Sequence, residues 1–328
     1  MTPGAHYQPQ ISDSLSSGSL GLALGSGSAR GLAHIGVLKV LEREGLPIDL
    51  IAGTSIGALI GGAYAIGLSV EEIEAIALAT SFRRLVSFVD VALPTRALVN
   101  GKRIEDFIRE IADGRTFADT RVPFACVAVD VTNGREVVLR EGDLATAIRA
   151  SISTPVVFAP VEHEGRLLVD GAVLNAVPVD VVREMGADVV IAVTTQGDDS
   201  RPDAASLEVV APVAAGFVRS ASTRAVSLVR RRVRTPAIYH HGIGSLDLMM
   251  RGLAEPRLRS ADLVIAPQLN GFGSYSFYRA ASIIAMGETS TEAALGEIRR
   301  LADRSQGASG ECGGGRVGVE RGAPCGTL

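Results

Sequence analysis

The sequence predicts an α/β fold, a single three-layer domain with a mainly parallel central sheet and helices on both faces. Short apolar runs typical of strands alternate with longer runs of helical periodicity, and two strand-to-helix junctions carry glycine-rich turns. The 328 residues are 47% hydrophobic and 21% charged, which is a globular composition with a real core. Strands that alternate with helices imply parallel pairing through crossovers.

The first two units of the chain each consist of a strand, a glycine-containing turn and a helix. The apolar runs are too short for helices, and the following segments repeat apolar residues every three or four positions. In order, the expected elements are strand 21–24, loop 25–31, helix 32–44, strand 50–52, turn 53–57 and helix 56–66.

The later elements follow from caps, turns and periodicity. Ser69 and Glu72 form a capping box, Asp143 is a candidate cap, Asn133-Gly134 indicates a hairpin, and Pro178 suits the first turn of a helix. The expected elements are helix 70–80, helix 103–111, strand 123–129, strand 136–139, a helix from Asp143 to 150, an extended run 156–161, strand 166–169, a helix after Pro178, strand 188–194, amphipathic stretch 207–234, strand 262–266 and helix 277–302.

Composition also bounds the domain organisation and the partners. Residues 1–19 resemble a disordered leader without the features of a secretory signal, 20–304 form the domain, and 305–328, with eight glycines, a disordered tail. Three cysteines show no disulfide or metal-ligand spacing, so we expect a cytoplasmic protein without a metal or other cofactor. The net charge of −4 argues against nucleic acid as a partner, and the oligomeric state stays open.

The turn Gly53-Thr54-Ser55-Ile56-Gly57 is the strongest candidate for chemistry. A Gly-x-Ser-x-Gly pentad between a strand and a helix suits a sharp turn that exposes the serine hydroxyl, with Gly53 and Gly57 leaving room beside it. The alternatives for Ser55 are a simple helix cap and, because no charge lies between Asp49 and Glu71, a membrane span. Five glycines and the lack of flanking basic residues argue against the span.

Acyl hydrolysis would need two further functions, an oxyanion site and a base. The loop 25–31 offers backbone N–H groups at a neighbouring strand-to-helix junction, and the carboxyl ends of parallel strands share one edge of the sheet. Asp170 directly follows an apolar strand and precedes Gly171, so its carboxylate is a candidate base, although Asp-Gly is also a common turn. Desolvation would raise its proton affinity.

Together, the glycine loop, Gly-Thr-Ser-Ile-Gly and Asp170-Gly171-Ala172 resemble the patatin-like phospholipases, most closely the bacterial branch. The likeness extends over about residues 20–195 and includes the helix 31–38 and the segment 150–160. That family consists of serine acyl hydrolases with a Ser–Asp dyad. The resemblance implies a lipid or other ester as substrate, with phospholipase A or lysophospholipase activity, and no metal.

Carried over by position, the resemblance makes Ser55 the nucleophile, Asp170 its base and the N–H groups around Gly27 and Ser28 the oxyanion hole. Gly25 begins that hole and Arg30 lies beside it. The family loop often has three consecutive glycines, whereas Ser26 and Ser28 flank Gly27 here, so a positive φ at these serines would be strained.

Three alternatives remain. His240 and His241 follow Asp170 in the chain order of a Ser-Asp-His hydrolase, although only two strands precede Ser55. The Gly25-x-Gly27-x-x-Arg30 pattern, with Asp49 downstream, mimics a dinucleotide fingerprint in which Arg30 replaces the small third residue. A binding module without catalysis is the third.

Six arginines in the stretch 207–234 are either a solvated helix face or a surface that attracts anionic lipid headgroups. The second interpretation corresponds to a peripheral contact with a membrane. The arginines are Arg219, Arg224, Arg230, Arg231, Arg232 and Arg234.

Overall fold

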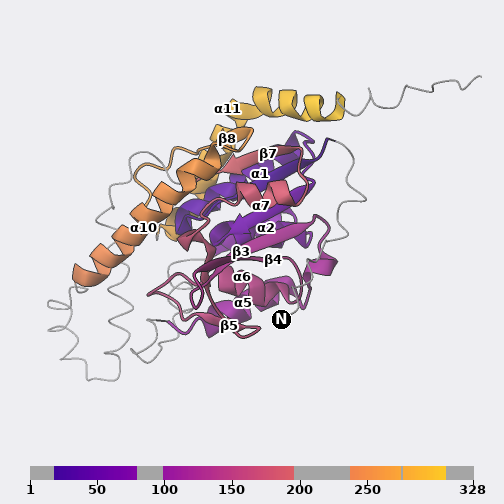
Figure 1. Ribbon diagram of the computed structural model, residues 1–328. Helices are drawn as coiled ribbons and strands as arrows, with labels where there is room; N and C mark the ends of the chain where they lie inside the picture. Colours follow the sequence, from indigo (N-terminus) through magenta and orange to yellow (C-terminus); the bar gives the residue numbers. More distant parts are fainter. Residues whose placement is uncertain (1–17, 80–98, 196–236, 275, 308–328) are drawn as a thin grey trace, which may run out of the picture.

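A computed structural model describes residues 18–79, 99–195, 237–274 and 276–307 (Figure 1). The described chain forms one eight-stranded sheet in the order β5-β6-β3-β2-β1-β7-β8, and β4 pairs with β3. Most of the predicted leader and tail, and the whole predicted stretch 207–234 with its arginines, lie outside the described residues. The division into leader, domain and tail stays a prediction.

Five strands form the parallel part of the sheet, as the alternation of strands and helices predicted. Their residues are buried because helices cover both faces of the sheet, apart from Leu263 and Val264 in the strand at the edge. In spatial order these strands are β3 (Phe124–Asp130), β2 (Leu50–Thr54), β1 (Leu20–Leu24), β7 (Val189–Val193) and β8 (Leu263–Ile265).

Three antiparallel strands extend this sheet beyond β3. They are β4 (Arg135–Leu139), β5 (Val161–His163) and β6 (Arg166–Asp170). β4 pairs with residues 126–130 of β3 along one edge, so β2 and β6 must share the other edge. There Thr54 pairs with Val127 and Asp170 pairs with Ala128. The strands β2 and β6 therefore run toward each other and meet end to end.

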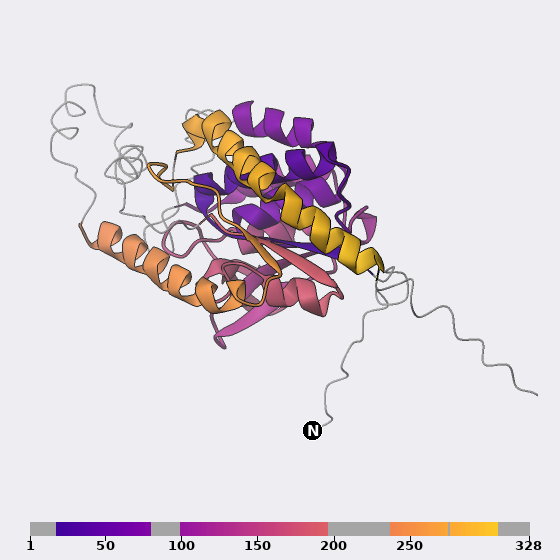
Figure 2. The same ribbon diagram turned by 90° about the horizontal axis from the view of Figure 1, so that it is seen from above.

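The helices form a layer on each face, which confirms the three-layer α/β prediction. One hydrophobic cluster joins α1 and α2 to α11, and a second joins α7 to α10 (Figures 1 and 2). The first layer holds α1 (Ala33–Arg43), α2 (Ile56–Ala65), α3 (Val70–Ala79), α5 (Lys102–Ala112), α6 (Leu144–Ser151) and α11 (Ala280–Gly307); the second holds α7 (Val179–Glu184) and α10 (Ala237–Leu258). Short 3-10 turns are η1 (Ser28–Leu32), η2 (Phe117–Asp119), η3 (Gly171–Val173) and η5 (Phe277–Arg279).

Several local predictions agree with the structure. The carboxylate of Glu72 accepts the N–H of Ser69, and Asp143 accepts the N–H of Thr146 at the start of α6. In the described residues no helix is long and apolar enough to cross a membrane. The candidate membrane span is instead divided among β2, a turn, α2 and the start of α3.

Other local predictions were wrong in detail. Helix α10 was not predicted, because Gly252 and Pro256 interrupt a pattern whose inward face consists of Met250, Ala254 and Leu258. Within the extended run 156–161 only the last residue belongs to a strand. The hairpin between β3 and β4 has a four-residue loop rather than a two-residue turn, and α11 continues past residue 302, where the predicted helix ends.

Candidate active site

Ser55 lies in a sharp, strained turn between β2 and α2. Its backbone has φ 57° and ψ −122°, a conformation that a residue with a side chain rarely adopts. A Cβ on Gly53 would lie 2.5 Å from the carbonyl oxygen of Gly57, and a Cβ on Gly57 would lie 2.2 Å from that of Leu24. Both glycines are therefore required by packing, as the pentad predicted.

The hydroxyl of Ser55 donates directly to a carboxylate. Its Oγ lies 2.8 Å from Oδ2 of Asp170, and its backbone N–H donates to Oγ of Ser151 at 3.0 Å. Ser55 is 8% exposed, so the hydroxyl lies just below the surface. The turn places a nucleophilic group and a proton acceptor in contact without an intervening imidazole.

Asp170 is held on every side by hydrogen bonds. Its N–H donates to the carbonyl of Ser153 at 3.0 Å, and Oδ1 accepts the N–H of Ala172 at 2.9 Å. Oδ2 accepts the hydroxyls of Ser55, at 2.8 Å, and of Thr154, at 2.9 Å. Burial raises the pKa of Asp170 to about 6, against the lowering effect of the donors Ala172, Ser55 and Thr154. The carboxylate thus binds a proton much more readily than a solvated aspartate and is still ionised at neutral pH.

The sheet topology explains how residues 115 positions apart come into contact. Ser55 follows the last residue of β2, and Asp170 is the last residue of β6. These two strands meet end to end against Val127 and Ala128 of β3. The antiparallel direction of β6 is therefore essential, because a parallel β6 would carry Asp170 away from Ser55.

The glycine loop after β1 contains the second strained serine. Ser28 has φ 51°, the positive value that its sequence position suggested, and Gly27 has φ 155°. The N–H of Gly25 donates to Val193 and that of Arg30 to Gly27. The sequence predicted an oxyanion hole formed by Gly25, Gly27, Ser28 and Arg30. Because the N–H groups of Gly25 and Arg30 already donate to backbone carbonyls, they are not available to an oxyanion.

The N–H groups of Gly27 and Ser28 remain as candidate donors. Across the described ranges, neither donates a hydrogen bond to the protein. The loop touches the Ser55 turn, because a Cβ on Gly31 would lie 2.0 Å from the side chain of Ile56. The two turns therefore lie against each other at the carboxyl edge of the sheet.

His34 supports the glycine loop from below. It is fully buried in α1, and its Nε2 lies 2.7 Å from the carbonyl oxygen of Gly25, to which it donates as the neutral ring. Burial lowers the pKa of His34 to about 4, and the bond to Gly25 opposes this only in part. The residue is packed and hydrogen-bonded, and its role is to hold the loop.

The sequence alone indicates no role for Ser151, which accepts the N–H of Ser55, or for Thr154, whose hydroxyl donates to Asp170. In the sequence, the segment 150–160 stands out only by its resemblance to the family. A run of small hydroxyl residues before the Asp170 strand was the available signal, but hydroxyls are common in turns. Their roles depend on where α6 ends relative to the sheet.

The residues of the alternative interpretations lie elsewhere or are not described. Asp49 precedes β2 and accepts the N–H of Leu20 at 2.7 Å, at the edge of the sheet opposite the glycine loop, which argues against a dinucleotide site. His240 and His241 belong to α10, but their side chains lie outside the described residues. Among the residues the structure describes, no group of three His, Cys, Asp or Glu could hold a metal ion.

A strained serine bonded to an aspartate, beside a glycine loop at a sheet edge, defines a class of α/β proteins with the layout of serine hydrolases. Residues 22–183 match the family model of patatin-like phospholipases, so this part of the chain is a patatin-like phospholipase domain. The matched region contains both strained turns and Asp170.

Relatives come from bacteria, fungi and animals. An uncharacterized NTE family protein of Mycobacterium tuberculosis is 38% identical over 187 residues, which cover 57% of this chain and 52% of that protein. The human patatin-like phospholipase domain-containing protein 6 is 35% identical over 190 residues, covering 56% of this chain and 14% of its own. Lysophospholipase NTE1 of Debaryomyces hansenii is 34% identical over 192 residues, covering 57% and 12%.

The chain thus spans about half the length of the mycobacterial relatives and a small part of the longer ones. Among solved structures, the crystal structure of VipD from Legionella pneumophila is similar, with a TM-score of 0.46 and 12% identity. That likeness covers 88% of this chain and 67% of VipD.

Proposed function

We propose that this protein is a serine acyl hydrolase that cleaves a carboxylic ester of a lipid. The observation that carries the proposal is the 2.8 Å hydrogen bond from the Ser55 hydroxyl to Oδ2 of Asp170. The family of the matched domain and the lysophospholipase name of one relative support a phospholipid or lysophospholipid as the substrate class.

In the first half-reaction, Asp170 accepts the proton of the Ser55 hydroxyl while Oγ attacks the ester carbonyl. The negative charge that develops on the carbonyl oxygen is stabilised by the N–H groups of Gly27 and Ser28, which donate to no other group among the described residues. The C–O bond then breaks, Asp170 returns the proton to the leaving alcohol, and the acyl group stays on Ser55.

In the second half-reaction, water gives a proton to Asp170 and attacks the acyl carbon. The bond from this carbon to Oγ of Ser55 then breaks, Asp170 returns the proton to Oγ, and the fatty acid is released. The raised pKa of Asp170, about 6, suits both proton transfers near neutral pH. N–H donors stabilise the charge on the oxyanion, and the Asp170 carboxylate accepts the proton of Ser55 or of water. The proposed reaction therefore needs no metal or other cofactor.

The direct test is to trap the nucleophile with an alkyl fluorophosphonate and to map the label by mass spectrometry. We expect the label on Ser55 and its loss in the Ser55→Ala variant. Hydrolysis of p-nitrophenyl butyrate should disappear in the same variant, with the Asp170→Asn variant as the probe of the base. Attachment to another serine, or full turnover in either variant, would contradict the proposal.

We also propose a peripheral contact with a membrane surface, where a lipid substrate resides. Leu248 and Met249 on the outer face of α10 are 66% and 65% exposed, and Arg230, Arg231 and Arg232 precede this helix in the sequence. We expect the protein to sediment with anionic phosphatidylserine vesicles, and the sedimented fraction to decrease as the salt concentration rises. With neutral phosphatidylcholine vesicles the sedimented fraction should be lower. Equal binding to both vesicle types at all salt concentrations would contradict this contact.

A further inference from the structure

The segment that follows α6 contacts both members of the Ser55–Asp170 pair. Ser151 accepts the N–H of Ser55, and the carbonyl of Ser153 accepts the N–H of Asp170. The next residue, Thr154, reaches the carboxylate itself, with its Oγ1 at 2.9 Å from Oδ2. Thr154 and Ser55 therefore donate to the same oxygen atom.

We propose that Thr154 is a positioning residue that sets the proton affinity of Asp170, and with it the pH range in which Ser55 is activated. The inference rests on the proposed function. It concerns a residue that contacts the base rather than the substrate.

The physical reason is the charge of the acceptor. A hydroxyl that donates to a carboxylate stabilises the ionised form and so lowers the pKa of the acid. Asp170 is 3% exposed, so bulk solvent compensates little for a donor that is removed. Without Thr154, the carboxylate would keep only the hydroxyl of Ser55 and the N–H of Ala172. Burial would then raise the pKa of Asp170 further above its ordinary value.

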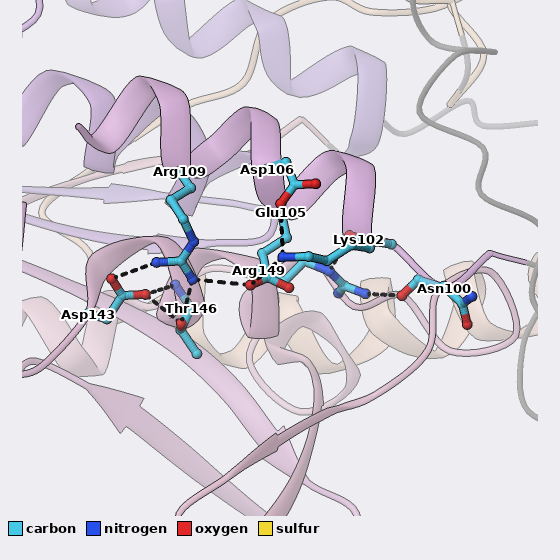
Figure 3. A network of polar contacts seen from close by, with 9 residues as sticks. Asn100, Lys102, Glu105, Asp106, Arg109, Asp143, Thr146 and Arg149 are labelled. Atoms are coloured by element: carbon cyan, nitrogen blue, oxygen red, sulfur yellow. Dashed lines mark hydrogen bonds and ion pairs between the residues drawn. The ribbon is translucent and has the colours of Figure 1, made fainter. Parts of the chain in front are cut away.

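A buried guanidinium fixes the segment that carries Thr154. Arg149 in α6 is 2% exposed, and its Nη1 donates to Oγ of Ser153 at 2.5 Å. Its Nη2 donates to the carbonyl of Asn100 at 2.9 Å (Figure 3). Its Nε also donates to the carbonyl of Gly101, and its Nη2 to that of Ala159, both at 3.1 Å. Thr154 therefore follows a backbone anchored at several points, so its hydroxyl is held toward Asp170.

Charged and titratable groups on the elements packed against β6 are bonded elsewhere or lie at its far end. Asp130 of β3 accepts the N–H of Thr132, and Cys126 of the same strand is fully buried with a raised pKa. Glu162 and His163 of β5 pair with Leu167 and Arg166, at the end of β6 away from Asp170. Arg149 of α6 bonds carbonyl oxygens and Ser153. The effects on Asp170 are burial and its three donors.

The experiment compares Thr154→Val, which removes the hydroxyl at nearly constant volume, with Thr154→Ser, which keeps it. We expect the acid limb of the kcat/KM profile for p-nitrophenyl butyrate to move up by roughly 0.5 to 1 pH unit in Thr154→Val. At pH 5.5 the variant should therefore be about three- to tenfold less active than the wild type, whereas at pH 8 this pH-dependent difference should disappear, and Thr154→Ser should restore the wild-type limb. An acid limb that stays in place in Thr154→Val overturns the inference.

A second readout does not depend on activity. The carboxyl ¹³C resonance of Asp170, assigned by its loss in Asp170→Asn, should titrate at higher pH in Thr154→Val than in the wild type. Thr154→Ala serves in its place should the valine variant not fold. If the wild type shows no Ser55-dependent hydrolysis, the proposed function fails, whereas an unmoved ¹³C midpoint would refute the role of Thr154 itself.

Discussion

The glycine loop after β1 and the turn 53–57 after β2, called the elbow below, have similar backbone geometry but are suited to different tasks. Each is a turn from a parallel strand into a helix, and each holds a serine at positive φ, Ser28 at 51° and Ser55 at 57°. The hydroxyl of Ser55 meets Asp170, whereas the loop leaves the N–H groups of Gly27 and Ser28 without a protein partner in the described ranges. The same local strain thus presents a hydroxyl in one turn and backbone donors in the other.

The groups below the two turns differ as well. In the elbow, Ser55 donates to Asp170, whose pKa is raised to about 6. In the loop, the carbonyl of Gly25 accepts a hydrogen bond from His34, whose pKa is lowered to about 4. Both shifts arise from burial, which disfavours the charged form of either group. The strained backbone of each turn exposes both a hydroxyl and N–H groups. The residue that packs against the turn from a distant part of the chain decides which of these is suited to chemistry.

The largest expected effect comes from the same small change made in both turns. Ser55→Ala should lower kcat/KM for p-nitrophenyl butyrate by at least about 10³-fold, because the attacking oxygen is lost. Ser28→Ala keeps its backbone N–H, so we expect a loss below about fivefold. Similar losses in the two variants would erase the distinction between hydroxyl and backbone donor.

Stability should separate the glycines of the two turns. In Gly57→Ala the new Cβ would meet backbone carbonyl oxygens of Leu24 and Gly25 at 2.2 and 2.7 Å, so we expect about 3 kcal/mol of lost stability. In Gly27→Ala it would meet mainly the Thr195 side chain, which can move more easily, so about 1 to 2 kcal/mol is expected even with positive φ.

Urea unfolding would measure both losses, with Gly296→Ala as the control. Gly296 is in α11, where a Cβ would meet nothing within 4 Å, so this change should raise stability slightly. A Gly57→Ala protein as stable as the wild type would refute the steric reason for the glycine of the elbow.

The smallest effect should appear in the pH dependence of stability. His34 has a lower pKa folded than unfolded, so its contribution is complete above about pH 6.5 and is lost as the pH falls toward 4. Between pH 6.5 and 5.5, the stability of the wild type relative to His34→Gln should fall by about 1 kcal/mol. Asp170 has the opposite sign, losing stability as the pH rises from about 4 to 6, and is common to both proteins. Parallel stability curves for the two proteins would contradict this view of His34.

The α/β class, the order of most elements and the two strained turns can be predicted from the sequence. These follow from local physics, since apolar periodicity selects strands and helices and steric limits require small residues at Gly53 and Gly57. It also pointed to Asp170, because an aspartate at the end of an apolar strand is conspicuous. The chemical roles of Ser55 and Asp170 stay predictions that the labelling and pH experiments test.

Which side chains contact one another depends on how the strands and helices are arranged in space. The end-to-end arrangement of β2 and β6 depends on strand pairing along one edge of β3, which no local pattern in the sequence encodes. The contacts of Ser151 and Thr154 depend on where α6 ends. Which N–H groups of the glycine loop could donate to an oxyanion depends on which of them already donate to backbone carbonyls. Hydrogen bonds between distant segments carry no periodic signal, so the chain must be folded before they can be seen.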